Sequence, residues 1–251
     1  MKGTNSADRI LSVLNLFTDG NLEWTTEQLM EELGYSRPTM YRYLRSLKDA
    51  GLLISISNSI LTLGPRVVEM DFLIRKSDPL VIFGNVHIHQ LARTYPSTSL
   101  LARWYGDKML CVASESSTTN AYTSYTRGRP MVLVRGAIAR TIVANLPRSH
   151  LDSHIKKYLE EFKNIGLGAD LFEVTNSFLE VKRSRVCVAR EEITPGVMGI
   201  ASPIFDTNNY PVAALCVTLG LNSLSSEDLG IIIDDIRGRS EKISKQMGRF
   251  L

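Results

Sequence analysis

The sequence predicts an α/β protein of two domains, and three features of the chain lead to this prediction. Its 251 residues exceed the roughly 100–150 residues of most single domains. The pattern over residues 1–64 predicts short helices followed by a hairpin. From residue 79 onward, strands interspersed with helices are typical of an α+β domain with one antiparallel sheet. We therefore expect domains over 1–64 and 79–251, joined by a linker helix over 65–78.

The composition is that of an ordinary globular protein, with 44% hydrophobic and 22% charged residues. No apolar run approaches the roughly 18 residues of a membrane span, and the first ten residues lack the apolar core of a secretory signal. The odd number of cysteines favours reduced thiols over a disulfide framework, at Cys111, Cys187 and Cys216. We expect a cytoplasmic protein, and its net charge of +3 is too small to identify a partner.

Two helices are expected in the first 34 residues. In the stretch RILSVLNLF, apolar residues recur at the spacing of one helical face, at Ile10, Val13, Leu14 and Phe17. The next helix, over 26–33, has the signature of a capping box, in which Thr25 and Gln28 bond each other's backbone N–H groups. Trp24 and Leu29 are spaced as the hydrophobic staple that often accompanies such a box.

A third helix follows after only two residues. Ser36 or Arg37 is expected to cap it, Pro38 lies in its first turn, where a missing N–H is tolerated, and Gly51 ends it. The stretch LLISISNSILTLG then predicts a hairpin that turns at Asn58-Ser59. Three helices and a hairpin, with a tight turn between the second and third helix, predict a winged helix-turn-helix.

The third helix separates into two faces when its residues are placed at 100° steps. One face is apolar and is expected to pack on the other helices, through Met40, Tyr43, Leu44 and Leu47. The opposite face is basic and aromatic, with Arg37, Tyr41, Arg42, Arg45 and Lys48. A basic face can simply keep a helix solvated, but on the second helix of a helix-turn-helix it lies where base edges are read. We therefore predict double-stranded DNA as a partner, with Ser36 and Thr39 at the helix N-terminus contacting phosphate.

The second domain is expected to begin with a helix from Pro79 and to end with a long helix from Ser225. A hairpin through Gly106-Asp107 joins two alternating segments. The pattern predicts further helices over 136–145, 149–163 and 170–183, and strands near 184–191, 196–205 and 211–220.

Three arginines precede the helix expected at residue 136, and a helix N-terminus beside an arginine can bind an anion. They are Arg127, Arg129 and Arg135. Arg135 stands in an apolar run and is the one we expect to be buried. The alternative is that the arginines are solvated or pair with Glu191 and Glu192.

At this point the sequence resembles the IclR-type (isocitrate lyase regulator) bacterial transcription factors. The resemblance rests on RILSVLNLF, on TTEQLMEELGYSRPTMYRYLRSLKDAGLL, on LTLGPRVVEM and on AREEITPGVMGIASPIFDTNNYPVAALCVTLG. It covers nearly the whole chain in the right order and spacing. It implies a GAF-like effector-binding C-terminal domain that binds small organic acids or aromatic compounds.

Candidate effector-binding residues come partly from this resemblance and partly from the pattern. Positions that match ligand positions of the family are Arg135, Gly136, Ala137, Glu192, Ala201, Pro203, Cys216 and Thr218. Strand alternation places Cys216 and Thr218 on one face. Candidate aromatic walls are Trp104, Tyr122 and Tyr125.

An enzyme is the main alternative. The chain has none of the common hydrolase, zinc-protease or phosphate-loop motifs. His150 and His154 are four residues apart and could share a metal, but no acidic or thiol ligand accompanies them, so no metal and no cofactor is expected. Cys216 could be a catalytic thiol, although no histidine lies near it in sequence.

The reading that fits best is a ligand-responsive transcriptional regulator. The resemblance implies a homodimer or a dimer of dimers on a palindromic operator, with two recognition helices in successive major grooves. A DNA-binding protein without a ligand is a further alternative. The sequence leaves open the operator, the effector and whether the protein is a repressor or an activator.

Overall fold

The computed structural model describes residues 5–57, 59–117, 125–221 and 225–250. The chain divides into two compact units, residues 1–77 and 78–251. The first contains α1 Ser6–Leu14, β1 Trp24–Thr25, α2 Thr26–Leu33, α3 Arg37–Asp49, β2 Leu53–Ser55, β3 Ile60–Leu63 and α4 Pro65–Ser77. The helices and strands of the second are α5 Pro79–Thr94, β4 Thr98–Trp104, β5 Met109–Ser116, α6 Ala137–Asn145, α7 Arg148–Lys157, α8 Leu159–Asn164, α9 Leu171–Ser184, β6 Cys187–Arg190, β7 Val197–Phe205, β8 Pro211–Gly220 and α10 Ser226–Phe250.

The first unit is a winged helix-turn-helix, as predicted. The described strands pair in the antiparallel order β1-β3-β2, with β2 and β3 as the wing. The capping box of α2 is present, since Thr25 and Gln28 bond each other's backbone N–H groups. Helix α1 spans Ser6–Leu14, whereas the predicted helix ran to Phe17. Phe17 instead lies in the turn after the helix and packs on the core from there. Asn58 of the predicted hairpin turn lies outside the described residues.

The core of this unit contains the predicted apolar face of α3. Met40, Tyr43, Leu44 and Leu47 are all at most 4% exposed, and Val13 of α1 joins Met40, Leu44 and Leu47 in one cluster. Burying side chains of this size stabilises the fold by roughly 1.5–3 kcal/mol each. The opposite face of α3 is thereby fixed toward solvent.

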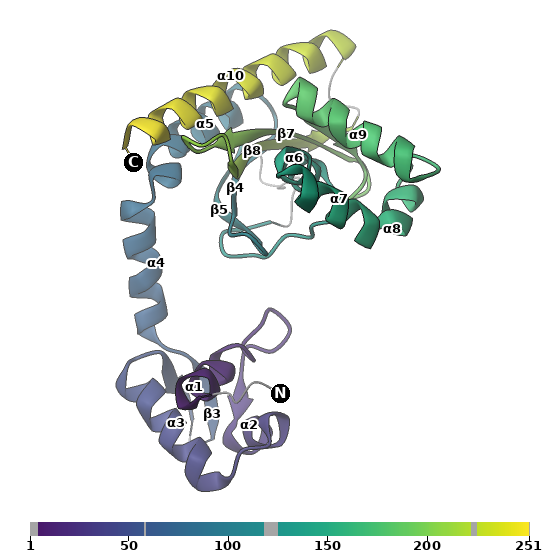
Figure 1. Cartoon of the computed structure of the whole chain (residues 1–251). Helices are drawn as coiled ribbons and strands as arrows, with labels where there is room; N and C mark the ends of the chain where they lie inside the picture. The colour runs from purple at the N-terminus through teal and green to yellow at the C-terminus, as the bar shows by residue number, and fades with distance from the viewer. Residues whose placement is uncertain (1–4, 58, 118–124, 222–224, 251) are drawn as a thin grey trace. The chain divides into compact units, whose positions relative to one another are not determined.

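The second unit is built on an antiparallel sheet of the described strands in the order β5-β4-β8-β7-β6. Figure 1 shows α5 and α10 on one face of this sheet and α6 to α9 on the other. Alternating residues divide between the two faces, so that Leu100 and Cys216 pack toward α6 while Leu101 and Leu215 pack toward α5 and α10. This is the two-domain α/β architecture that the sequence predicts.

One predicted helix of this unit is divided in the structure. The helix expected over 149–163 is broken at Tyr158, whose φ of −120° and ψ of 26° are not helical, and α7 and α8 result. The ring of Tyr158 packs against that of His154, with ring centroids 4.8 Å apart and an angle of 55° between the ring planes. Helix α10 begins as predicted, with Ser225 and Asp228 bonding each other's backbone N–H groups.

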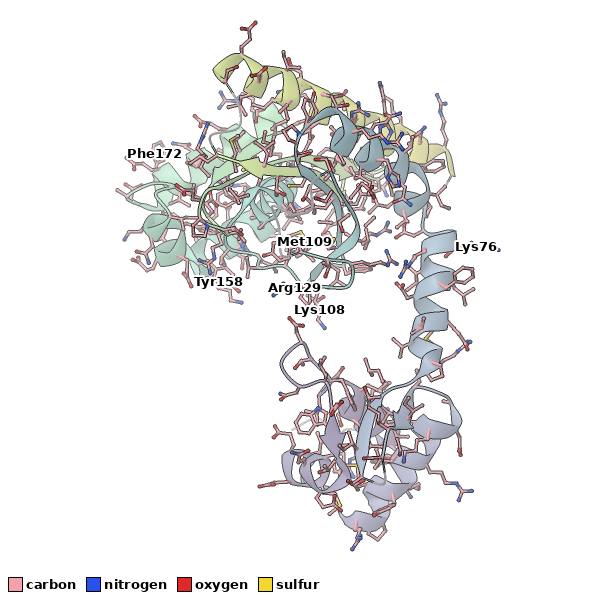
Figure 2. The ribbon with its side chains drawn as sticks, turned by 180° about the vertical axis from the view of Figure 1, so that it is seen from behind. Lys76, Lys108, Met109, Arg129, Tyr158 and Phe172 are labelled. Carbon is pink, nitrogen blue, oxygen red and sulfur yellow. The ribbon has the colours of Figure 1, made fainter. Side chains whose placement is uncertain are left out.

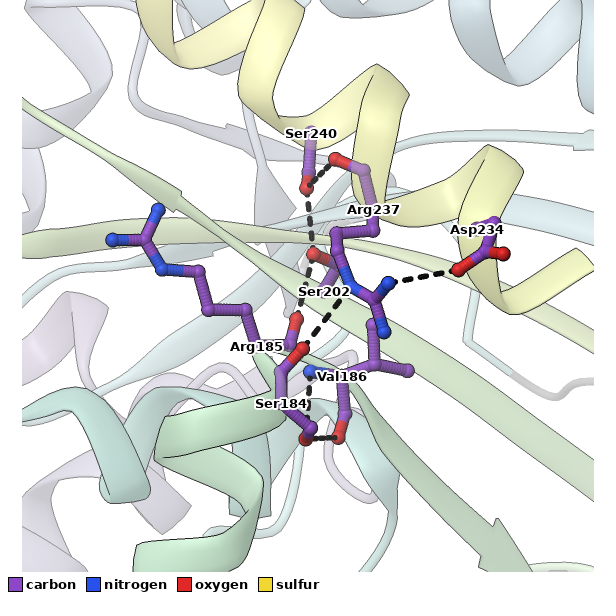
Figure 3. Close-up of polar contacts among 7 residues, drawn as sticks. All are labelled: Ser184, Arg185, Val186, Ser202, Asp234, Arg237 and Ser240. Atoms are coloured by element: carbon purple, nitrogen blue, oxygen red, sulfur yellow. Dashed lines mark hydrogen bonds and ion pairs between the residues drawn. The ribbon is translucent and has the colours of Figure 1, made fainter. Parts of the chain in front are cut away.

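Helix α10 is fastened to the sheet by a network of polar contacts (Figure 3). Ser202 of β7 donates to the carbonyl of Arg185, and its hydroxyl lies 2.6 Å from that of Ser240 on α10. Arg237 of α10 donates to the carbonyl of Ser184 at 3.1 Å. The network thus joins α10, β7 and the end of α9. No helix of the described chain is long and apolar enough to cross a membrane.

Candidate functional site

The solvent face of α3 carries the side chains predicted to read DNA. Arg37, Tyr41, Arg42, Arg45 and Lys48 are all exposed. The contact of Arg45 is long and exposed: its guanidinium lies 3.8 Å from Asp49, and these side chains are 85% and 72% exposed. Such exposed pairs contribute roughly 0–1 kcal/mol, so the arginine can exchange the carboxylate for a phosphate or a base.

Two contacts order this surface. Lys48 Nζ donates to Ser55 Oγ of the wing at 2.8 Å, which ties the end of α3 to β2. At the other end, Ser36 occupies the N-cap position, but its side chain makes no cap hydrogen bond. It donates instead to Thr39 Oγ1 at 3.0 Å. The first N–H groups of α3 are therefore not capped by Ser36, which suits a helix end expected to meet phosphate.

The second unit holds a small cavity between the sheet and the start of α6. Its volume is about 50 Å³, enough for a few water molecules. The sheet contributes Leu100, Met109, Ala189, Val197, Gly199, Cys216 and Thr218. Helix α6 and the segments beside it contribute Tyr125, Met131, Val132, Arg135, Gly136, Ala137, Ile138, Ala139, Glu192, Ile193 and Thr194. The walls are mostly apolar.

The segment 128–131 runs beside β5 (Figure 2), and Met131 at its end lines the cavity. Met131 N donates to the carbonyl of Met109 at 2.8 Å, and Cys111 N donates to that of Arg129 at 3.2 Å. The chain that follows this segment is held by a side chain of α7, since His154 Nε2 lies 3.0 Å from the carbonyl oxygen of Leu133.

Glu192 lines the cavity beside the start of α6. Its Oε2 accepts from the backbone N–H of Gly136 at 2.7 Å, and its Oε1 accepts from Arg140 Nη1, also at 2.7 Å. The side chains of Glu192 and Arg140 are only 10% and 12% exposed. A carboxylate of the chain itself therefore binds the N–H of Gly136, the residue before α6, where the sequence suggested an anion site.

The structure brings together most of the predicted effector-binding residues. The cavity is lined by Tyr125, Arg135, Gly136, Ala137, Glu192, Cys216 and Thr218. The prediction that Cys216 and Thr218 face the same way is correct. Trp104, Ala201 and Pro203 do not line the cavity: Trp104 Nε1 contacts Tyr210 OH at 3.4 Å, and Pro203 borders a groove beside α10. Tyr122 lies outside the described residues.

The expectation that Arg135 is buried was wrong. Arg135 is exposed and only borders the cavity, because the apolar run around it forms an irregular segment instead of a strand or a helix. The buried arginine is Arg140, one turn into α6, and it pairs with Glu192 as the sequence had suggested for its neighbours. The available signal for this pair was an arginine inside the apolar helix AIARTIVAN.

The three cysteine thiols are buried. Burial raises the pKa of Cys111 to about 11 and that of Cys187 to about 12, and it raises the pKa of Cys216 as well. Such thiols stay protonated at neutral pH and are poor nucleophiles. In the part of the chain that the structure describes, no three His, Cys, Asp or Glu side chains are grouped to hold a metal ion.

Comparison with known proteins decides the family. Residues 6–54 match the IclR helix-turn-helix domain, and residues 75–245 match the domain described as bacterial transcriptional regulator IclR C-terminal. The chain belongs to the IclR family of bacterial transcriptional regulators. It is a DNA-binding regulator with a ligand-binding C-terminal domain, and it is not an enzyme.

Similar proteins span nearly the whole chain. The transcriptional regulator KipR of Bacillus subtilis is 22% identical over 241 residues, 95% of either chain. KdgR of Escherichia coli is 24% identical over an alignment of 260 residues, 96% of this chain and 94% of that one.

Solved structures share the fold. An IclR transcriptional regulator from Alicyclobacillus acidocaldarius superposes with a TM-score of 0.77 at 20% identity, covering 97% of this chain and 98% of that one. An IclR homologue from Microbacterium hydrocarbonoxydans, complexed with 4-hydroxybenzoate, gives a TM-score of 0.76 at 16% identity, covering 97% and 99%.

Proposed function

We propose that this IclR-family regulator binds a palindromic operator as a dimer or a dimer of dimers. A small organic compound, an acid or an aromatic, would occupy the cavity of the second unit and change the affinity for DNA. The observation that carries the proposal is the exposed face of α3, where arginines and a tyrosine stand over a fully buried opposite face. Arginine side chains of this kind read guanine edges and bind phosphate.

The residues proposed to contact DNA all lie on α3 or at its N-terminus. They are Ser36, Arg37, Thr39, Tyr41, Arg42, Arg45 and Lys48. The long side chains reach base edges in the major groove, while the two hydroxyls and the helix N-terminus contact phosphate. Lys48 is also bonded to the wing, so it would hold the wing in place as well as contact the backbone of DNA.

The linker helix α4 supports self-association. None of its described residues is buried, and its apolar side chains are 42–72% exposed, at Val68, Met70, Phe72, Leu73 and Ile74. A helix of 13 residues is marginal in water unless an apolar face packs on something. A second copy of the chain, which presents the same exposed apolar side chains, suits a two-fold symmetric operator.

A small molecule in the cavity can act on DNA binding only by binding one arrangement of the protein better than another. The residues proposed to contact it are those predicted residues that the cavity brings together, with Met109, Met131 and Ile193 as additions. A DNA-binding protein that senses no ligand would show no stabilisation by any compound in a metabolite screen.

The test of DNA binding is a mobility-shift titration with the DNA upstream of the protein's own gene. Arg42→Ala or Arg45→Ala should weaken binding by about 1–3 kcal/mol each, roughly 5- to 150-fold, and lower the dependence of binding on salt. Arg183→Ala removes the same charge from an exposed position on α9 and should leave binding unchanged. Binding by all three variants equal to that of the unmodified protein would contradict the assignment of this face.

A further inference from the structure

We propose that Arg9 of α1 is a further DNA-binding residue, which contacts a backbone phosphate beside α3. This contact rests on the proposed DNA-binding function and extends the DNA-binding surface from α3 to a second helix. It follows from the way in which two arginines and two tyrosines join α1 to the turn before α3 and to α3 itself. These residues are Arg9, Tyr35, Arg42 and Tyr43.

The exposed face of α3 has two flanks. Lys48 lies on the flank next to the wing, where it donates to Ser55 Oγ at 2.8 Å. At 100° per residue, Arg42 lies toward the other flank, between the outward-facing Arg45 and the buried Tyr43. The guanidinium carbon of Arg42 is 5.4 Å from the centroid of the Tyr43 ring. Arg42 therefore points away from the wing.

Tyr35, in the turn before α3, brings Arg9 of α1 to this second flank. The rings of Tyr35 and Tyr43 meet edge to face, with centroids 5.7 Å apart and an angle of 83° between the ring planes. The guanidinium carbon of Arg9 lies 6.0 Å from the centroid of the Tyr35 ring, a distance at which the ring attracts a cation. Tyr35 OH also lies 3.1 Å from Ser12 Oγ of α1. Two arginines from different helices thus rest on one pair of tyrosines.

The charges of these two arginines act on the same hydroxyl group. A hydrogen bond to Ser6 of α1 lowers the pKa of Tyr43; burial opposes this effect, and Arg42 and the charge of Arg9 add to it. Among the described residues, no acidic side chain forms an ion pair with either arginine. Asp8, the acidic neighbour of Arg9, is held in the capping box of α1. The protein therefore leaves a positive charge on this flank that is not paired with a carboxylate.

The width of the major groove indicates what this charge meets. A groove about 12 Å wide holds a helix of about 10–12 Å diameter. A helix in the groove therefore has a phosphate backbone along both flanks, and a cation beside one flank meets phosphate. Arg9 is exposed, and a guanidinium carries five N–H donors in a fork that fits two phosphate oxygens. It can rest on the ring of Tyr35 and still bind a phosphate.

The salt dependence of DNA binding by the full chain tests this contact. Arg9→Ala should reduce the slope of log affinity against log salt concentration by about 0.9, the value for one phosphate. The loss of affinity should then be roughly threefold larger in about 50 mM KCl than in about 200 mM KCl. It should be equal for the DNA upstream of the protein's own gene and for an unrelated duplex of the same length, because a phosphate contact carries no sequence information. Fluorescence anisotropy titrations of both duplexes measure these changes.

Three variants serve as comparisons. Arg9→Lys keeps the charge and should keep the salt dependence of the unmodified protein. Arg45→Ala removes a proposed base contact and should lower the preference for the upstream duplex over the unrelated one. Arg183→Ala removes an exposed charge from α9 and should change neither quantity. The melting temperature of each variant shows that it is folded, and Arg9→Gln, which keeps most of the side chain, replaces Arg9→Ala if that variant does not fold.

The outcomes separate the role of Arg9 from the proposed function. If Arg9→Ala keeps the salt slope of the unmodified protein while Arg45→Ala weakens binding, Arg9 does not contact phosphate and the DNA-binding function stands. A loss of affinity that is the same at both salt concentrations would show that Arg9 only supports the fold, and it would also overturn the contact. Failure of the unmodified protein to bind either duplex would count against both the contact and the proposed function.

Discussion

Gly136 lies at the N-terminus of α6 with a φ of +88°, a conformation that side-chain-bearing residues rarely adopt. Two further constraints meet there: its N–H donates to Glu192, and an added Cβ would lie 2.9 Å from Ile193 Cγ1. A single residue thus contacts both the start of the helix and the segment of Glu192 and Ile193 that lines the cavity.

We expect Gly136→Ala to lower the free energy of unfolding by about 2–4 kcal/mol, because backbone strain of roughly 1–3 kcal/mol adds to the contact with Ile193. Gly106→Ala is the control, since its φ is +92° but nothing lies within 4 Å of the added Cβ, and it should show the strain alone. Urea unfolding of the two variants measures the difference. If both variants lose the same free energy of unfolding, the contact between the added methyl group and Ile193 does not destabilise the fold.

At the scale of elements, α3 and α4 are helices of equal length with opposite relations to the core. Helix α3 buries a complete apolar face, whereas α4 buries no described residue. Packing against another surface would remove the apolar side chains of α4 from water, and we propose that this surface belongs to a second copy of the chain.

Phe72→Glu should lower the self-association of the full chain by at least about tenfold, because a charge replaces an apolar side chain that we place in the interface. Sedimentation velocity over a range of concentrations measures this change. Phe172→Glu is the matched control: Phe72 is 61% exposed on α4 and Phe172 is 72% exposed on α9 (Figure 2). If both variants associate like the unmodified protein, α4 is not the interface.

At the scale of the whole molecule, stability should depend on pH through two histidines of the second unit, the buried His87 and the partly buried His154. Burial lowers the pKa of His87, with Arg239 and Lys242 acting in the same direction and Asp235 opposing them. Burial also lowers the pKa of His154, and Lys157 adds to this effect while the hydrogen bond to Leu133 opposes it. Below the ordinary pKa of about 6.5, the unfolded chain binds a proton that the folded chain does not yet bind.

The contribution of these histidines is therefore complete above a pH of about 6.5 and is lost as the pH falls through their lowered pKa values. We expect the free energy of unfolding, measured by urea titration, to decrease between pH 7 and pH 5. In His154→Gln, whose amide can still donate to Leu133, the decrease should be smaller. A pH dependence that His154→Gln leaves unchanged would mean that other groups govern it.

Much of this molecule could be predicted from local pattern. Helical phase alone separated the buried Met40 and Leu44 from the exposed Arg42 and Arg45, because a helix on a single core must bury one face. The capping box at Thr25 was equally predictable, since both of its partners lie within four residues. The break in the helix at Tyr158 could not be predicted in this way. Tyr158 packs on a core that includes residues far from it in the sequence.

The sequence by itself determined the two-domain architecture, the winged helix-turn-helix and the face of α3 that meets solvent, all of which depend on residues close together in the chain. Only the tertiary structure decided the chemistry of the cavity. Glu192 and Gly136 are 56 residues apart, and the local sequence does not indicate which of several arginines pairs with this carboxylate. The sheet and α6 bring Glu192 to Arg140 and leave Arg135 exposed, because the pairing of buried charges depends on distances that only the folded chain defines.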